Sequence, residues 1–344
     1  MKNITILWWF GFWNIWDDII LFNEIKLIKE KFPNSIITVF SWNPSFIKSK
    51  FSVNSLYLPP IMWYRFYKFL NIIYLIKIFK VIKNTDLFIL WGGWFFSDRQ
   101  FFAISWWLRY CLLAKYFWAK VIWFWMWIGP IFYNRNKKVI NMYSKIFEYI
   151  SVRDKKSFNI LKWCWFDEKK IIKVIDPAFF TNFKKENKDN TIWFIVKSNE
   201  NFIINQIKDI LIKTNYNIKF IITDSLDLNL NIKIINQIWS NRCKLISHKN
   251  IDLIIKEIWK CDFIVSQRLH GSIISFTQKV PFLNMYYHHK WKEMINYLWI
   301  DKFSVDINKL NNLQILDFIN WKHNFIFTKL DLLDFKNKFL WKIK

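Results

Sequence analysis

The residues best suited to chemistry form a short motif, Ser-Gln-Arg-Leu-His-Gly, at positions 266–271. Arg268 offers a planar fork of donors that matches a phosphate or a carboxylate, and His270 can donate or accept a proton near neutral pH. A strand predicted over 263–266 ends at this motif, and a helix predicted to begin at Gly271 adds its positive dipole. The pattern predicts an anion site with a proton donor. The alternative is a capping Arg beside a structural His.

A second arginine also follows a predicted strand. Arg153 stands in Ser-Val-Arg-Asp at 151–154, after a strand predicted over 149–152. It is either a further anion ligand or half of an Arg–Asp pair that fixes the start of the next helix. The loop Tyr-Tyr-His-His-Lys at 286–290 has adjacent His residues but no carboxylate at ligand spacing. We therefore expect a substrate-facing or surface loop that includes Lys290, and no metal.

Three polar residues near the amino terminus lie where a helix is predicted to begin. Asn14, Asp17 and Asp18 follow a strand predicted over 4–7 and precede an amphipathic pattern over 19–31. Carboxylates at a helix start complement its dipole. Alternatively, these residues bind sugar hydroxyls, and Asp17 or Asp18 acts as a base.

Tryptophan stands in several turns where a chain ordinarily needs glycine. The sequence has 23 Trp and only 5 Gly, whereas glycine makes up about 7% of an average chain. When Trp is read as Gly, the segment 7–18 becomes a Gly-rich turn that opens a helix, which is a backbone cradle for an anion. The same reading produces Gly-rich turns at 90–94 and 121–130 and a helix-ending Gly at 299. We expect the glycines already present in these turns to line the ligand site: Gly11, Gly92, Gly93 and Gly129.

An indole at these positions is physically costly. Trp does not adopt positive φ readily and keeps a ligand away from the main chain, whereas Gly allows both. Some bacterial lineages read UGA as Gly, and the abundance of residues with A/T-rich codons, such as Lys, Asn, Ile and Phe, fits such a genome. We hypothesise that most of the 23 positions are UGA codons decoded as glycine in the cell. The alternative is a truly Trp-rich protein.

Composition narrows the range of partners. The net charge of +25 is expected to lie mainly on solvated Lys-rich faces, with attraction of an anionic substrate or lipid as the alternative. We expect no nucleic-acid partner, because no Arg-rich helix, RNP-like motif or finger spacing is present. No uninterrupted apolar run reaches the ~18 residues that span a bilayer, and the four Cys lack metal-ligand spacing. We expect a cytoplasmic protein with free thiols, and the inner face of the membrane as an alternative place of action.

Short apolar strands alternate with helical patterns along most of the chain, which predicts two α/β domains with doubly wound parallel sheets. We place the first domain at 1–180, a polar linker at 181–190, the second domain at 191–307 and a helical tail at 308–344. Ligands of such folds sit at the carboxyl ends of strands. We therefore expect a cleft between the domains.

With Trp read as Gly, the motifs resemble those of the polysaccharide pyruvyl transferase family, in order along residues 4–300. The matching segments are GFGNIGDD at 11–18, LGGGG at 90–94, GMGIGP at 125–130, SVRD at 151–154, DPAF at 176–179, SQRLHG at 266–271 and PFL…Y…HK…LGI at 281–300. Many members have Tyr-Asp-Pro-Lys where this chain has 287–290. Here Lys290 is retained and the Asp is absent, which weakens assignment to a subgroup more than to the family.

The resemblance implies two Rossmann-like domains, similar to the GT-B glycosyltransferase architecture. It also implies transfer of pyruvate from phosphoenolpyruvate onto a glycan or lipid-linked saccharide as a ketal, with no metal or nucleotide cofactor. By motif match, Arg268, Leu269 and His270 belong to the phosphoenolpyruvate site, and Arg153 is a further anion ligand. Asp17 is then the candidate base.

Two alternatives stay open. One is a GT-B-like glycosyltransferase that uses a nucleotide sugar. The other is a non-catalytic glycan-binding or membrane-associated protein, in which a basic helix predicted over 61–83 lies on an anionic bilayer.

Overall fold

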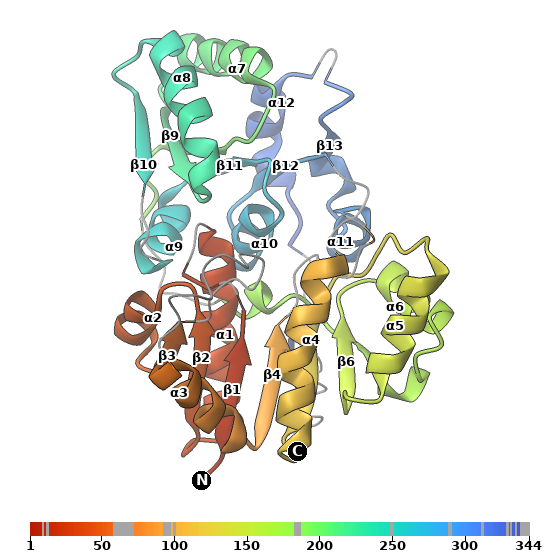
Figure 1. Ribbon diagram of the computed structural model, residues 1–344. Coiled ribbons are helices and arrows are strands. Elements are labelled where there is room, and N and C mark those ends of the chain that lie inside the picture. The colour runs from red at the N-terminus through yellow and green to blue at the C-terminus, as the bar shows by residue number, and fades with distance from the viewer. Residues whose placement is uncertain are drawn as a thin grey trace. The chain divides into compact units, whose positions relative to one another are not determined.

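The computed structural model describes the chain apart from residues 9, 12–13, 58–71, 92–97, 99–100, 182–186, 248–250, 288–290, 311–312, 328–329, 331, 334–335 and 338–344. The chain divides into two compact units (Figure 1). The first comprises Met1–Phe12, Glu24–Asp176 and Leu333–Lys344, and the second comprises Trp13–Asn23 and Pro177–Leu332. The beginning of the first helix therefore packs with the second unit.

The first unit is built on a seven-stranded parallel sheet with the order β3-β2-β1-β4-β5-β6-β7. Its strands are β1 (Asn3–Leu7), β2 (Ile36–Ser41), β3 (Asn54–Tyr57), β4 (Leu87–Trp91), β5 (Lys120–Met126), β6 (Tyr149–Val152) and β7 (Ile171–Lys173). Continuous apolar runs form the central strands, as a sheet covered on both faces requires. The strand order reverses between β1 and β4, which is the place where doubly wound folds bind ligands.

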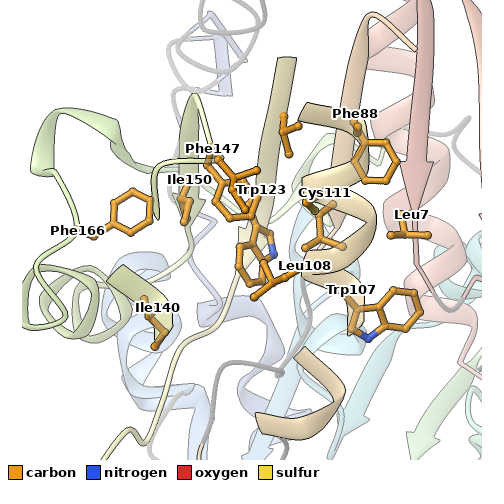
Figure 2. Close-up of a cluster of buried hydrophobic side chains, with 14 of the residues drawn as sticks. Leu7, Phe88, Trp107, Leu108, Cys111, Trp123, Ile140, Phe147, Ile150 and Phe166 are labelled. Carbon is orange, nitrogen blue, oxygen red and sulfur yellow. The ribbon is translucent and has the colours of Figure 1, made fainter. Parts of the chain in front are cut away.

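Helices connect these strands. They are α1 (Ile15–Lys31), α2 (Pro44–Phe51), α3 (Ile72–Lys83), α4 (Phe101–Tyr116), α5 (Asn134–Ser144) and α6 (Lys155–Trp163). Four of them, α3 to α6, bury residues such as Ile78, Leu108, Ile140 and Leu161 in one apolar cluster with the sheet. Figure 2 shows this cluster around Trp123 and Phe147. This core fixes one face of each helix and leaves the opposite face to solvent.

The second unit repeats the architecture with a six-stranded parallel sheet, in the order β10-β9-β8-β11-β12-β13. Its strands are β8 (Thr191–Ile195), β9 (Asn217–Ile222), β10 (Cys243–Ser247), β11 (Phe263–Ser266), β12 (Phe282–Tyr286) and β13 (Ser304–Asp306). Its helices are α7 (Glu200–Lys213), α8 (Leu228–Ile238), α9 (Ile251–Lys260), α10 (Leu269–Thr277), α11 (Trp291–Leu298) and α12 (Ile315–Asn320). The order reverses between β8 and β11. The predicted fold class is thus confirmed in both units.

In the part of the chain that the structure describes, we find no helix with the length and apolar content needed to cross a membrane.

Several tryptophans have a backbone conformation that suits glycine. Five of them have φ between 50° and 67°: Trp118, Trp125, Trp165, Trp239 and Trp299. Four of the five come one or two residues after a helix, and their indoles are largely exposed. The left-handed conformation costs a residue with a Cβ roughly 1–2 kcal/mol, and glycine is the usual residue after a helix. These exposed indoles therefore add strain without burying apolar surface.

Glycine at two of these positions is expected to stabilise the protein. We expect Trp118→Gly and Trp239→Gly each to raise the free energy of unfolding by about 1 kcal/mol, because each relieves a left-handed Trp that is over 90% exposed. Trp321→Gly is the matched control, since Trp321 is also exposed but has φ −86°. Urea titration measures all three. An equal effect of the three substitutions would contradict the explanation.

A buried carboxyl group lies on α1. Glu24 has no exposed surface, and neither of its oxygens has a hydrogen-bond partner among the described residues. Burial raises the pKa of Glu24 well above its ordinary value, because desolvation disfavours the charged form. The free energy of unfolding is therefore not reduced by Glu24 below the pKa of this group in the unfolded chain, about 4.5. It falls as the pH rises from there towards the raised pKa of the folded protein, because the unfolded chain ionises and the buried carboxyl group does not.

Glu24→Gln should remove this pH dependence. We expect the free energy of unfolding of the unsubstituted protein to fall between pH 5 and pH 8 through this group. Gln keeps the shape without the charge, so the variant should lose that part of the slope. Denaturant titrations at the two pH values test this, and identical slopes for the two proteins would contradict it.

Candidate functional site

In the second unit, the strand order reverses between β8 and β11, and we call this place the switch point of the unit. One glutamine side chain connects the two loops that leave the sheet there. Gln267 follows β11 and is fully buried. Its Oε1 accepts hydrogen bonds from the backbone N–H groups of Lys197 (2.8 Å) and Ser198 (2.9 Å), which follow the neighbouring strand β8. One side chain thus fixes the two loops that leave the sheet on either side of the reversal in strand order. This is where ligands of doubly wound folds bind.

The amino terminus of α10 opens directly after β11. Arg268 is its N-cap residue, so Leu269 and His270 stand in the first turn, where backbone N–H groups have no partner within the helix. A Cβ on Gly271 would lie 2.4 Å from Ser266 Oγ and 2.6 Å from Ile195 Cδ1. Gly271 therefore allows the helix to start close against the sheet, and its dipole makes this end attractive to anions.

The Arg268 guanidinium is held by two carboxylates. Its Nη2 donates to both oxygens of Asp227, at 2.6 Å each, and its Nε donates to Asp227 Oδ2 at 3.0 Å. Nη2 also reaches Asp224 Oδ2 at 3.2 Å. These aspartates lie in and next to the short helix η4 (Ser225–Asp227), after β9. Burial raises the pKa of Asp227, and the nearby Arg268 opposes that shift.

This pairing leaves the Nη1 group of Arg268 as a possible donor to a ligand. The bonds recorded among the described residues use Nε and Nη2 of Arg268 and not Nη1. The aspartates therefore set the plane of the guanidinium. Arg268 can contribute one well-oriented donor to an anion, which then needs further cationic partners. Lys197 is exposed on the loop after β8 and lowers the pKa of Asp227 by its charge, and its Nζ lies 4.0 Å from the centroid of the Tyr287 ring.

The same segment after β9 holds the amino-terminal motif. Asn14 forms a β-bridge with Asp224, and the N–H of Ile15 donates to the carbonyl of Thr223 at 3.1 Å. The Asn14 side chain accepts from the N–H of Trp16 at 3.1 Å and so caps α1. Asn14 and the Arg268 motif, far apart in the sequence, are thereby brought to one segment of the second unit.

An indole fills the space beside His270. The ring centroids of Trp16 and His270 are 6.1 Å apart, and only 2% of Trp16 is exposed. The indole nitrogen of Trp16 finds no acceptor among the described residues. Asp17 is half-buried and Asp18 is buried in the same first turn of α1, where both complement the helix dipole.

Arg153 lies in the first unit and is also paired with a carboxylate. Its Nη1 donates to Asp176 Oδ2 at 2.6 Å, and its guanidinium stacks over the Trp127 ring at 5.1 Å. Asp154 caps α6 by accepting from the N–H of Ser157 at 2.7 Å. Arg153 therefore pairs with Asp176, while Asp154 caps α6 without it, and anion binding by Arg153 stays a prediction.

Aromatic rings also occupy the switch point of the first unit. Trp8 and Phe10, which follow β1, contact Trp91 at the end of β4, with ring centroids 4.8 and 5.6 Å from it. The indole nitrogen of Trp91 is buried without an acceptor among the described residues. At both switch points, then, indoles stand where the fold ordinarily leaves room for a ligand.

The predicted glycines lie partly within the described residues. Gly11 and Gly129 have φ of 73° and 98°, which favours glycine at both positions. A Cβ on Gly129 would meet Ile160 Cδ1 at 2.4 Å. The predictions for Gly92, Gly93 and Lys290 fall outside the described residues.

Four residues at this end of the second sheet were not among the predicted site residues: Lys197, Asp224, Asp227 and Gln267. A signal for the aspartates is present in Thr-Asp-Ser-Leu-Asp at 223–227, which directly follows the predicted strand at 218–222. Among the described residues, no three His, Cys, Asp or Glu side chains gather as a metal site requires.

Comparison with known proteins agrees with the motifs. A family model described as polysaccharide pyruvyl transferase matches residues 14–289, most of the chain and the same family that the motifs resemble. No curated protein sequence matches the chain.

Solved structures are similar in fold. The putative UDP-N-acetylglucosamine 2-epimerase of Listeria monocytogenes is 12% identical, with a TM-score of 0.63 over 100% of this chain and 96% of that one. The UDP-GlcNAc 2-epimerase of Neisseria meningitidis, bound to UDP-GlcNAc, has the same identity and TM-score over 100% and 99%. A glycosyltransferase of Rickettsia africae is 13% identical, with a TM-score of 0.57 over 98% and 91%. These similarities confirm the predicted GT-B-like fold.

Proposed function

Because the chain belongs to the polysaccharide pyruvyl transferase family, we propose that it transfers pyruvate from phosphoenolpyruvate to a sugar of a cell-surface polysaccharide, as a ketal. The observation that carries the donor assignment is the group of hydrogen-bond donors at the carboxyl end of the second sheet. There the first turn of α10, the oriented Arg268 and the exposed Lys197 lie at the switch point between β8 and β11. Phosphoenolpyruvate has a phosphate and a carboxylate, and this arrangement offers donors for two anionic groups.

The aspartates beside Arg268 orient its guanidinium and leave Nη1 to face a ligand. Asp227 and Asp224 balance the guanidinium charge, so a neutral sugar gains little by displacing them. A trianionic donor attracted by Lys197 and the α10 amides can share Arg268 through Nη1. Arg153 is a further proposed anion ligand in the first unit, where its pairing with Asp176 orients it in the same way.

The proposed reaction needs three proton transfers and no redox step. A proton from His270 adds to the C3 methylene of phosphoenolpyruvate, and C2 becomes electrophilic. A sugar hydroxyl adds to C2 and loses its proton to a base, for which Asp17 is our candidate. The C2–O bond to phosphate then breaks, and inorganic phosphate leaves with the electron pair. A second hydroxyl adds to C2 and gives its proton to the departing phosphate. The products are the ketal and phosphate.

We further propose that the indoles at the switch points are glycines in the cell, decoded from UGA. Support comes from the left-handed Trp residues after helices, and from indole nitrogens buried without acceptors among the described residues at Trp16, Trp91 and Trp193. A buried polar group without a partner costs roughly 1–3 kcal/mol. Glycine at Trp16 removes this cost and leaves space beside His270 for the donor.

The acceptor is proposed to be a glycan or a lipid-linked saccharide, which would place the reaction at the inner face of the membrane. No cofactor is proposed. A nucleotide-sugar glycosyltransferase remains the second candidate, because solved structures of this fold include proteins whose descriptions name UDP-GlcNAc.

A turnover assay tests the proposal. The protein, made with glycine at every UGA codon, is incubated with phosphoenolpyruvate and a panel of nitrophenyl glycosides, and inorganic phosphate is measured. We expect glycoside-dependent release of phosphate and a product heavier by one pyruvyl ketal. UDP-GlcNAc-dependent transfer without phosphate release from phosphoenolpyruvate would favour the second candidate.

A further inference from the structure

Apolar side chains gather on an exposed face of the first unit, and we propose that this face docks onto a bilayer that contains anionic phospholipid. The face consists of residues from α3 and the carboxyl-terminal half of α4, each at least 43% exposed: Leu75, Ile76, Phe79, Leu112 and Tyr116. We call it the α3–α4 surface. Trp118, which is also exposed, is left out because its left-handed backbone marks it as a proposed glycine.

The α3–α4 surface is continuous across the two helices. Phe117, just after α4, packs edge-on against Phe79 of α3 with ring centroids 5.1 Å apart, and it contacts Tyr116 at 5.2 Å. Both helices cover the same face of the sheet (Figure 1), and they bury Ile82 and Cys111 in the core of the first unit. The exposed residues lie opposite this core, so the apolar surface is surplus to what the fold itself requires.

Positive charge lies beside the apolar residues of α3, whereas Lys115 of α4 is paired with Glu148 at 2.7 Å. Lys77, Lys80 and Lys83 are exposed on α3, and no ion pair to any of them is recorded among the described residues. The sequence has no Asp or Glu between Glu30 and Asp86. From 31 to 147 it has sixteen Lys and Arg residues and two acidic ones, so this part of the first unit carries much of the net charge.

This combination fits a membrane better than a protein. Protein interfaces are depleted in Lys, because an ordered, desolvated ammonium on a long side chain is unfavourable there. At a bilayer, by contrast, apolar side chains enter the acyl boundary while flanking lysines stay with the anionic headgroups. Each lysine near an anionic surface adds about fivefold to the affinity. Anionic lipid is therefore the occupant that both features of the α3–α4 surface match.

This inference does not rest on pyruvyl transfer, because lipid binding is measured without any substrate. Its failure would leave the proposed reaction intact. Its success would place the enzyme next to a lipid-linked acceptor.

Co-sedimentation with vesicles tests the proposal. We compare vesicles of phosphatidylcholine alone with vesicles in which about a third of the lipid is phosphatidylglycerol. We expect at least tenfold tighter binding to the anionic vesicles, weakened by salt. The triple variant Lys77→Gln, Lys80→Gln, Lys83→Gln should lose at least tenfold of that affinity. The pair Ile76→Ser, Phe79→Ser should lose the binding that persists at high salt.

Matched variants from the second unit serve as controls, because a strongly basic protein binds anionic vesicles to some degree over its whole surface. Lys208→Gln, Lys302→Gln and Lys309→Gln remove three exposed lysines there, and Ile212→Ser removes an exposed apolar side chain. We expect these controls to bind like the unsubstituted protein. Equal losses in the two sets, or no preference for anionic vesicles, would overturn the proposal. So would a dimer in solution that Ile76→Ser, Phe79→Ser abolishes, since a second copy would then be the occupant.

Discussion

Arg268→Lys is expected to lower kcat/KM for phosphoenolpyruvate by at least about a hundredfold. Lysine keeps the positive charge but loses the planar fork, so it cannot bond Asp227 through two nitrogens and still present a fixed donor to the substrate. A loss of a hundredfold corresponds to about 2.7 kcal/mol of transition-state stabilisation, in the range expected for a charged hydrogen bond lost from an active site. Phosphate release at several donor concentrations measures it.

Arg242→Lys is the matched control for this substitution. Arg242 lies in the same unit and donates to the backbone carbonyl groups of Thr214 (2.7 Å) and Tyr216 (3.3 Å) after α7. We expect Arg242→Lys to lower stability at most and to leave kcat/KM unchanged. Full activity of Arg268→Lys, or equal losses in the two variants, would remove Arg268 from the proposed donor site.

In the protein that has Trp at all the positions printed, the substitution Trp16→Gly is expected to raise the affinity for phosphoenolpyruvate at least tenfold. The indole of Trp16 lies against His270 and buries its nitrogen without an acceptor among the described residues. Glycine removes the ring and exposes the main chain at the start of α1, which allows close approach of a ligand. Calorimetric titration with phosphoenolpyruvate measures the change.

Trp16→Phe separates the opening of this space from a mere change of residue. Phenylalanine keeps an aromatic ring at the position, so we expect it to leave the affinity within about twofold of the Trp16 chain. If the Phe variant gains as much as the Gly variant, the indole does not obstruct the donor. If neither gains, the space beside His270 is not the donor site.

The fold could be predicted from the sequence because its signals are local. Short apolar strands separated by amphipathic helices identify parallel sheets. On either side of the Arg268 motif, β11 ends at Ser266 as predicted, and α10 begins at Leu269, two residues before the predicted start at Gly271. No element was predicted over 44–57, which forms α2 and β3. The Asn, Pro and Ser residues of this segment obscure a helix of only eight residues. Residues 228–238 form α8, which the sequence analysis missed because Asn and Lys interrupt its apolar pattern.

The pairing within the candidate site was beyond the reach of local patterns. Asp227 and Arg268 are 41 positions apart, and only the neighbouring positions of β9, β8 and β11 in the sheet bring them together. The same holds for Asn14, whose contact with Asp224 places the amino-terminal motif in the second unit. Sequence reasoning identified Arg268 and His270 as candidates from their chemistry, but it had no means to find the carboxylates that orient the arginine.

Competition between two ligands tests the proposed donor most directly. The protein made with glycine at every UGA codon is titrated with phosphoenolpyruvate in a calorimeter, alone and in the presence of excess UDP, and the titration is repeated with Arg268→Lys. We predict saturable binding of phosphoenolpyruvate that UDP leaves unchanged and that Arg268→Lys weakens at least tenfold. Binding of UDP with no binding of phosphoenolpyruvate would contradict the account and identify a nucleotide-sugar enzyme instead.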